Sequence, residues 1–195
     1  AIRTDVSQFD QVKQAVALTL EQFGQIDILV NNAGGSARGN MSLFCDSEQD
    51  TWDHVLGTNL NGVLYTCRAV IGSMLERGRG SIINIGSVAG MIGLAGQADY
   101  SAAKGAVIAF SKALAKETVA KGVRVNCVSP GPITSAAGRN IPPEVKAKLA
   151  RTSLGQATGF GHFGHPDDIA NLVAFLASDE AGYIAGQNYP VCGVM

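Results

Sequence analysis

The chain has 195 residues, of which 46% are hydrophobic and 16% are charged, and its formal net charge is −1. This length and apolar content predict a single domain with one sizeable core. The sequence has no basic tract, no apolar run of about 18 residues and no visible signal peptide, which excludes nucleic acid and membranes as expected partners.

The cysteines and histidines give no metal-binding pattern. The four cysteines are far apart in the sequence, without a CxxC pair or a neighbouring histidine: Cys45, Cys67, Cys127 and Cys192. His162 and His165 lie in a glycine-rich loop without nearby cysteines or paired carboxylates, so we expect them to be solvent-exposed. We therefore predict no metal site and no disulfide, and interpret the cysteines as buried thiols in a reducing cytoplasm.

The first half of the chain alternates between helical and strand patterns. Residues 1–4 read as the end of a strand, and Asp5 and Ser7 are candidate helix caps. A helix is predicted over 9–23, ended by Gly24. The run IDILV at 26–30 has no polar alternation, as expected for a parallel strand buried on both faces. A long helix follows over about 50–76, with an interruption near 58–62.

The same alternation continues in the second half. Strands are predicted at 81–85, 123–128 and 187–191. One helix contains Tyr100, and another covers 167–176 with Pro166 near its first turn. Between them lies a loop-rich insert, 133–165, with one short helix near 143–151. Such alternation predicts an α/β fold, a doubly wound parallel sheet of Rossmann type, whose ligands bind beyond the carboxyl ends of the strands.

Three loops rich in small and polar residues would meet at this end of the sheet. They contain Asn31–Gly34, Ser87 and Pro130–Thr134, each of which follows a predicted strand. Their convergence at one edge predicts a binding site there.

Tyr100 and Lys104 form the central chemical feature of the sequence. Four residues apart on a helix, they lie on one face about one turn apart. A cation beside a phenol favours the phenolate, so the tyrosine proton moves more readily near neutral pH. Ser87, just after a strand, could hydrogen-bond the oxygen of a carbonyl or an alcohol. Alone, a tyrosine and a lysine at this spacing could also be an ordinary surface pair.

The sequence resembles the short-chain dehydrogenase/reductase family over essentially all 195 residues. The matching pieces, in order, are Asp5-Val6, Asn31-Asn-Ala-Gly34, Asn59 within TNLNG, Ser87, Tyr100-x-x-x-Lys104 and Pro130-Gly-Pro-Ile-Thr134. The ending HPDDIANLVAFLASDEAGYIAGQNYPV adds a likeness to 3-oxoacyl-acyl-carrier-protein reductases and to similar sugar and steroid dehydrogenases.

This resemblance implies an NAD- or NADP-dependent oxidoreductase that transfers a hydride between nicotinamide and a carbonyl or secondary alcohol. Tyr100 would exchange the proton with the substrate oxygen, and Lys104 would lower the tyrosine pKa and bind the nicotinamide ribose. Ser87 would polarise the carbonyl, and Asn59 would hold a water of a proton relay. Further cofactor contacts would come from Asp5, Val6, Asn32, Ala33, Gly34, Pro130, Gly131, Ile133 and Thr134. A cytoplasmic homotetramer would be typical of the family.

The match departs from the family pattern at the beginning. No TGxxxGxG turn, which binds the cofactor pyrophosphate, precedes Asp5. We therefore expect an N-terminally incomplete domain over 1–195 that lacks its first βαβα portion, and the preference between NAD and NADP cannot be read. Strand 26–30 would then lie at an exposed edge that favours association.

The pattern leaves three functional hypotheses. The first is the oxidoreductase. The second is a truncated, catalytically silent homologue that acts as a binding or oligomerisation partner. The third is a lyase or epimerase that uses the same tyrosine and lysine on a nucleotide sugar, which the simple-dehydrogenase character of the C-terminal half disfavours.

Overall fold

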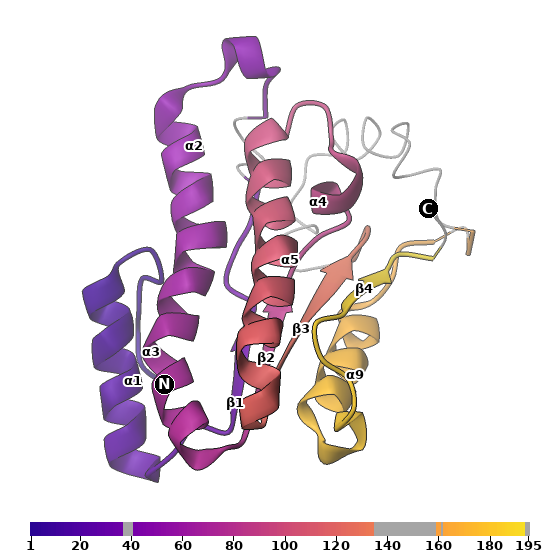
Figure 1. Ribbon diagram of the computed structural model, residues 1–195. Coiled ribbons are helices and arrows are strands. Elements are labelled where there is room, and N and C mark those ends of the chain that lie inside the picture. The colour runs from indigo at the N-terminus through magenta and orange to yellow at the C-terminus, as the bar shows by residue number, and fades with distance from the viewer. Residues whose placement is uncertain (37–40, 135–158, 161, 194–195) are drawn as a thin grey trace.

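A computed structural model describes residues 1–36, 41–134, 159–160 and 162–193 (Figure 1). Its centre is a parallel sheet in the order β1-β2-β3-β4. The strands are β1 (Ile28–Asn31), β2 (Gly80–Ile85), β3 (Val123–Pro130) and β4 (Asn188–Val191). Helices lie on both faces, so the predicted doubly wound α/β fold is confirmed.

The two faces of the sheet carry different helices. On one face pack α3 (Gly62–Arg77) and α5 (Ala98–Thr118), with α1 (Phe9–Phe23) beside α3 (Figure 1). On the other face, α9 (Pro166–Ala177) covers β2 and β3. Shorter elements connect them: η2 (Phe44–Asp46), α2 (Gln49–Leu56), η3 (Gly57–Asn61), α4 (Ala89–Ile92), η4 (Val119–Lys121) and η5 (Asp179–Ala181).

Strand period explains how one sheet serves two cores. Ile82 on β2 and Val125 on β3 point into the core formed with α3 and α5. Their neighbours in sequence, such as Ile83, point into the smaller core under α9. Because both sides are covered there, β2 and β3 are continuous apolar runs, as expected for parallel strands.

The predicted burial of 26–30 on both faces is wrong. Ile28 and Val30 remain 48% and 41% exposed, because α9 reaches β2 and β3 but leaves the same face of β1 uncovered. β1 is one of the two edge strands of the described sheet, and the sequence predicted its position at an edge. Its other two side chains, those of Leu29 and Asn31, face the core beside α3.

Other local expectations need correction. Residues 1–4 form no strand, and the N-cap of α1 is Gln8. Asp5 and Ser7 instead bond each other, because the Asp5 carboxylate accepts hydrogen bonds from the backbone and hydroxyl of Ser7. These bonds hold the pKa of Asp5 below its ordinary value. The helix predicted near 143–151 lies outside the described residues.

The cysteines are only partly as predicted. Cys67 and Cys127 are buried thiols, and burial raises the pKa of Cys67 to about 12. Cys45 is exposed and Cys192 is intermediate, because the turns that carry them lie outside both cores. Among the described residues, no group of three or more His, Cys, Asp or Glu side chains could hold a metal ion. No described helix is long and apolar enough to cross a bilayer.

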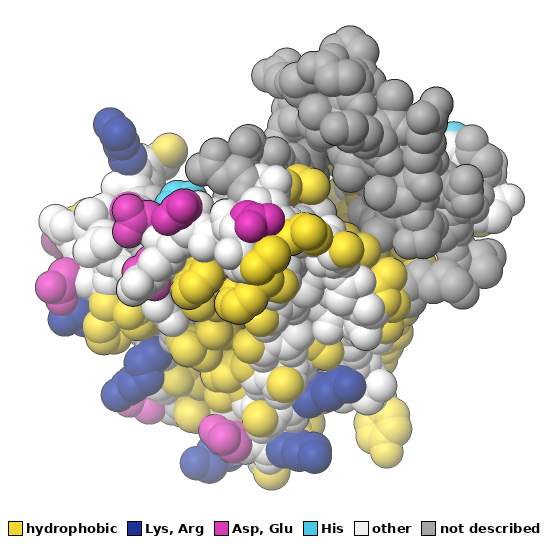
Figure 2. Space-filling view, turned by 90° about the horizontal axis from the view of Figure 1, so that it is seen from above, with side chains coloured by type: hydrophobic (Ala, Val, Ile, Leu, Met, Phe, Trp, Pro, Cys, Tyr) yellow, Lys and Arg dark blue, Asp and Glu magenta, His cyan; other side chains and the backbone are white. Residues whose placement is uncertain are grey.

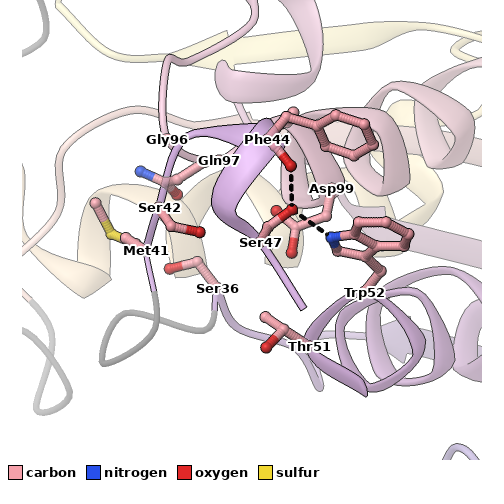
Figure 3. Close-up of a pocket in the computed structure, with 11 residues that line it drawn as sticks. Ser36, Met41, Ser42, Phe44, Ser47, Thr51, Trp52, Gly96, Gln97 and Asp99 are labelled. Atoms are coloured by element: carbon pink, nitrogen blue, oxygen red, sulfur yellow. Dashed lines mark hydrogen bonds between the residues drawn. The ribbon is translucent and has the colours of Figure 1, made fainter. Parts of the chain in front are cut away.

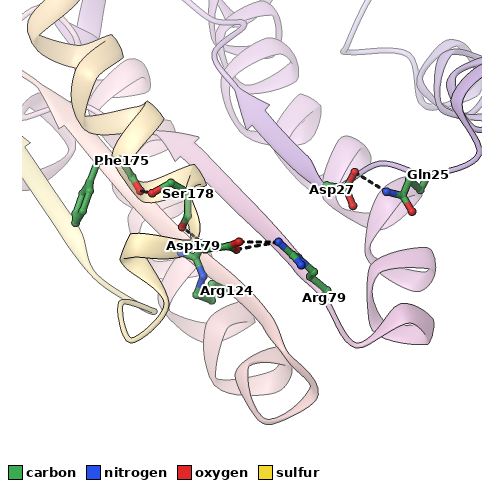
Figure 4. A network of polar contacts seen from close by, with 7 residues as sticks. All are labelled: Gln25, Asp27, Arg79, Arg124, Phe175, Ser178 and Asp179. Atoms are coloured by element: carbon green, nitrogen blue, oxygen red, sulfur yellow. Dashed lines mark hydrogen bonds and ion pairs between the residues drawn. The ribbon is translucent and has the colours of Figure 1, made fainter.

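Both ends of α9 are tied down by side chains. At its start, His165 and Asp168 form a capping box, and Pro166 occupies the first turn as predicted. At its end, the Arg124 guanidinium donates to the carbonyl oxygens of Leu176 and Ser178 at 2.8 and 3.0 Å. Figure 4 shows Arg124 next to Asp179, which forms a separate ion pair with Arg79 at the surface.

We predict that Arg124→Ala destabilises the protein by about 1–2 kcal/mol, because two carbonyls at a helix C-terminus lose charged donors. Arg79→Ala is the matched control. Its ion pair is 70% and 87% exposed, so the loss should stay below about 1 kcal/mol. Urea unfolding of both variants measures the difference, and an equal loss in the two would contradict this account of α9.

Candidate active site

Lys104 is the most unusual side chain of the described chain. It lies on the sheet-facing side of α5, is only 4% exposed, and donates a hydrogen bond from Nζ to the Ile85 carbonyl at the end of β2, at 2.8 Å. Burial disfavours the ammonium and lowers the pKa of Lys104 to about 8. An amine with this pKa is still mostly protonated at neutral pH, but it gives up its proton more readily than a surface lysine.

Tyr100 lies one helical turn before Lys104 and is half-buried. The Lys104 Nζ lies 5.8 Å from the centre of the tyrosine ring, so the expected proximity of cation and phenol is present. A positive charge at this distance, in surroundings with little water, stabilises negative charge on the phenol oxygen.

Asn59 joins this pair from the other side. It is fully buried in the π-helical turn η3, and its side chain grips Gly35 by donating to that residue's carbonyl at 2.8 Å and accepting from its N–H at 3.1 Å. Its second amide proton goes to the Val55 carbonyl at 2.9 Å. Both amide protons are therefore used by the backbone, and only the Asn59 carbonyl oxygen retains an acceptor position.

Gly34 lies between Asn59 and Lys104. A Cβ placed on Gly34 would meet the Asn59 Oδ1 at 2.6 Å and the Lys104 Nζ at 3.3 Å. The turn after β1 therefore passes directly over both side chains, which requires a residue without a side chain. This contact joins three of the predicted site residues, and Asn32, Ala33 and Gly34 are exposed beside it.

Ser87 follows β2 and is buried. Its Oγ accepts a hydrogen bond from the Ala89 N–H at 3.1 Å, so the hydroxyl proton is left to be donated elsewhere. The loop is held against α5 by glycines: a Cβ on Gly90 would lie 2.5 Å from the backbone of Lys104 and Gly105. The helix turn that begins beside Ser87 therefore contacts the helix turn that carries Lys104.

The remaining predicted cofactor residues surround this centre at different distances. Val6 packs against Gly62, at the start of α3 and three residues after Asn59. The carbonyl of Pro130 accepts from Val88 N–H, next to Ser87, and Gly131 bonds Val191 on β4. Ile133 and Thr134 pair with Gly164 at the two ends of the insert. Asp5 is exposed in the turn beside Val6.

A pocket that the sequence did not predict lies beside Asp99, the residue before Tyr100. It is formed by the segment after β1, by α2 and by residues 96–99, which include the first two residues of α5 (Figure 3). Phe44 stacks on Trp52 at 5.0 Å between ring centres, and Ser47 accepts from the indole N–H. Phe44 and Trp52 are eight residues apart and belong to different elements, so no sequence period indicates their contact.

The surface around the carboxyl ends of the strands has apolar character. Figure 2, seen from above, shows hydrophobic side chains across the middle of the described surface. The exposed hydrophobic residues of η2, α4 and the segment before η2 are Met41, Leu43, Phe44, Met91 and Ile92. An apolar surface therefore lies at the same end of the sheet as the Ile85 carbonyl that accepts from Lys104.

A four-stranded parallel sheet with helices on both faces defines a Rossmann-like α/β fold, and the buried Lys104 lies at the carboxyl end of β2 beside Tyr100. A family model described as Enoyl-(Acyl carrier protein) reductase matches residues 1–193. The 3-oxoacyl-(acyl-carrier-protein) reductase FabG of Chlamydia pneumoniae is 42% identical over 192 residues, covering 98% of this chain and 74% of the relative.

Two further relatives match nearly the whole chain at similar identity. The acetoacetyl-CoA reductase of Allochromatium vinosum is 44% identical over 189 residues, which cover 97% of this chain and 74% of that protein. FabG of Thermotoga maritima is 37% identical over 184 residues, 94% of this chain and 71% of the relative. The chain therefore belongs to the short-chain dehydrogenase/reductase family, whose members are NAD(P)-dependent oxidoreductases.

The residues at the site fit the nicotinamide end of such a cofactor. The turn from Asn32 to Gly34 is exposed, so a ligand can reach its backbone, and the absence of a side chain on Gly34 lets that turn lie close to Lys104. Lys104 offers an ammonium, which only donates hydrogen bonds and suits ribose hydroxyls. Its position directly below Gly34 places that donor beneath the exposed turn.

We predict that Gly34→Ala lowers cofactor affinity and turnover by roughly tenfold or more, because the new methyl group displaces Asn59 or Lys104. Gly35→Ala is the control, since a Cβ there meets nothing within 4 Å. Equilibrium titration with NADH and NADPH compares the two variants. A larger loss of cofactor affinity in Gly35→Ala than in Gly34→Ala would contradict the importance of the close approach at Gly34.

We predict that Lys104→Met stabilises the fold at neutral pH. Lowering the lysine pKa from 10.5 to about 8 corresponds to about 3 kcal/mol against the buried ammonium, and the lost bond to Ile85 offsets about 1–2 kcal/mol of that. Between about pH 8 and pH 10.5, Lys104 binds more protons in the unfolded state than in the folded state, so the stability of the wild type rises with pH. The difference in stability in favour of Lys104→Met therefore becomes smaller. Urea unfolding at several pH values measures the difference in free energy of unfolding between Lys104→Met and the wild type. A difference that does not change with pH would refute the lowered pKa of Lys104.

Proposed function

We propose that this chain carries the acid–base site of an enzyme that interconverts a 3-oxoacyl thioester and its 3-hydroxy form with a nicotinamide cofactor. One observation carries the proposal: the buried Lys104 ammonium lies one turn from Tyr100 and directly beneath Gly34. The substrate class is supported by the names of the relatives, a 3-oxoacyl-(acyl-carrier-protein) reductase and an acetoacetyl-CoA reductase, which share a 3-oxo thioester.

The chain's own residues handle the proton. Tyr100 gives its phenol proton to the substrate oxygen in reduction and takes it back in oxidation. Lys104 stabilises the phenolate that remains, because its charge lies 5.8 Å from the ring in a poorly hydrated place. NAD(P)H, when bound, supplies the hydride.

Ser87 orients the substrate carbonyl. Because its oxygen already accepts from Ala89, its proton is directed away from that N–H and is donated to the carbonyl oxygen. Two donors, Ser87 and Tyr100, would then polarise one oxygen, the arrangement that stabilises developing negative charge.

Asn59 acts mainly by holding the turn over Lys104, and its remaining acceptor position is the place for the water of a proton relay. Lys104 and the exposed turn at Asn32–Gly34 bind the nicotinamide ribose and its neighbouring groups. Asp5, Val6, Pro130, Gly131, Ile133 and Thr134 complete the cofactor contacts in this proposal. A cytoplasmic homotetramer remains the expected assembly by analogy with the family.

The first test is a titration of the purified chain with NADH and with NADPH, monitored by nicotinamide fluorescence. The second test measures turnover of an acetoacetyl thioester. We expect saturable binding, and Tyr100→Phe should reduce turnover by at least about a hundredfold while leaving cofactor affinity within about twofold. Phenylalanine keeps the ring and removes the phenol hydroxyl, and with it the exchangeable proton.

Turnover by Tyr100→Phe close to wild type would remove Tyr100 from its role. A folded chain that binds neither cofactor would refute the proposal for this chain, and would favour the alternative of a catalytically silent homologue that acts as a binding partner. A circular dichroism spectrum distinguishes that outcome from simple misfolding.

A further inference from the structure

A continuous chain of side-chain hydrogen bonds crosses the sheet just below the candidate site. Its members are Thr66 on α3, Asn31 on β1, Asn84 on β2 and Ser111 on α5, hereafter the cross-sheet chain. Thr66 donates to Asn31 at 2.6 Å, Asn31 to Asn84 at 2.8 Å, and Asn84 to Ser111 at 2.9 Å. Ser111 in turn donates to the Val107 carbonyl at 2.7 Å.

The cross-sheet chain is buried almost throughout. Asn84 and Ser111 are fully buried and Asn31 is 8% exposed. Asn31 and Asn84 are register partners, and Asn84 is also paired with Cys127 on β3, so the two amides lie side by side on the face covered by α3 and α5. Each of the four side chains donates a hydrogen bond of 2.6–2.9 Å along this series, and such connected buried polar groups favour one packing arrangement.

Each end of the cross-sheet chain lies the same number of residues after a site residue in the sequence. Ser111 comes seven residues after Lys104 on α5, and Thr66 comes seven residues after Asn59 along η3 and α3. On α5, seven residues are about two turns of α-helix, so Ser111 lies on the same helix face as Lys104. Asn84 is adjacent to Ile85, whose carbonyl accepts from Lys104.

Rotation of α5 about its axis would break this arrangement. Lys112, the residue after Ser111, is exposed, and rotating the helix by one residue would bring it toward the Asn84 amide, leaving that buried donor without a partner. Apolar packing by Val107 and Ile108 resists such rotation much less specifically, because apolar contacts are not directional.

We propose that Asn84 and Ser111 are positioning residues for the proposed reaction: their hydrogen bond sets the rotation of α5 and so holds Lys104 against Ile85 and beside Tyr100. Asn31 and Thr66 extend the same control to α3 and Asn59. The inference rests on the proposed function for its meaning in catalysis. The mechanical part concerns only the placement of Lys104, and can be measured without cofactor or substrate.

The experiment is competitive acylation of the lysine amines of the intact chain between about pH 7 and pH 10, read residue by residue by mass spectrometry. It gives the pKa and the accessibility of each amine, with exposed Lys112 and Lys116 on the same helix as internal references. The titratable neighbours of Lys104 are Tyr100 and Cys127, and burial keeps the Cys127 pKa above its ordinary value.

We predict that Ser111→Ala and Asn84→Ala each raise the pKa of Lys104 by roughly one unit and increase its accessibility, because a displaced ammonium is better hydrated. Ser73→Ala is the matched control: this serine on α3 donates only to the Val70 carbonyl of its own helix, among the bonds described. Ser111→Thr, which keeps the hydroxyl, should restore the wild-type behaviour of Lys104.

An unchanged Lys104 in both alanine variants, with native circular dichroism, overturns the inference, as does an equal change in Ser73→Ala. If Ser111→Ala fails to fold, Asn84→Ala decides. This outcome is independent of the proposed function. A protein that binds no cofactor still reports the placement of Lys104. A protein with full turnover can still show that the cross-sheet chain does not control that placement.

Discussion

The hydrogen bond from the Lys104 ammonium to the Ile85 carbonyl is the interaction on which the site depends. A lysine that is 4% exposed is costly to bury, and the fold accepts this cost at the place where a strand ends and a helix passes over it. The surrounding structure follows from holding that charge. Gly34 leaves room above it, the backbone contact of Gly90 fixes the neighbouring loop, and the π-helical turn at Asn59 closes the remaining side. Strained or costly features of this kind concentrate where a protein does chemistry.

Much of the fold could be predicted from the sequence, because regular elements carry their own periodic signals. Three elements are found where their sequence patterns indicate: the helix capped by Gly24, the helix interruption at Asn59 and the strand that ends at Ile85. The errors come from tertiary context. The apolar run ending at Val30 reads as a doubly buried strand, yet burial depends on what covers the strand. Asp5 and Ser7 read as caps, but they satisfy each other.

The candidate site was predictable to the extent that its spacing in the sequence is diagnostic. Tyr100 and Lys104 are one turn apart on a helix, so their meeting follows from helix geometry alone. The contact of Gly34 with Asn59 and the bond between Asn84 and Ser111 join residues 25 and 27 positions apart, which no local pattern encodes. Whether the domain lacks its first βαβα portion stays a prediction, since the described elements do not test it. The pocket beside Trp52 shows the same limit, because its walls come from three segments.

The contact between Gly90 and Gly105 has a consequence for how the site can change over generations. Because two backbones touch there, the segment from Ser87 to Gly90 and the helix turn at Lys104 pack together as one unit. Gly93, where φ is 70°, marks the end of that unit, and the residues between it and Gln97 are joined to α5 mainly through Leu94 and Ser101. Mutations beyond Gly93 can therefore reshape the wall that faces a substrate while the proton-handling groups keep their positions. The architecture separates a part that can diversify from a part that cannot.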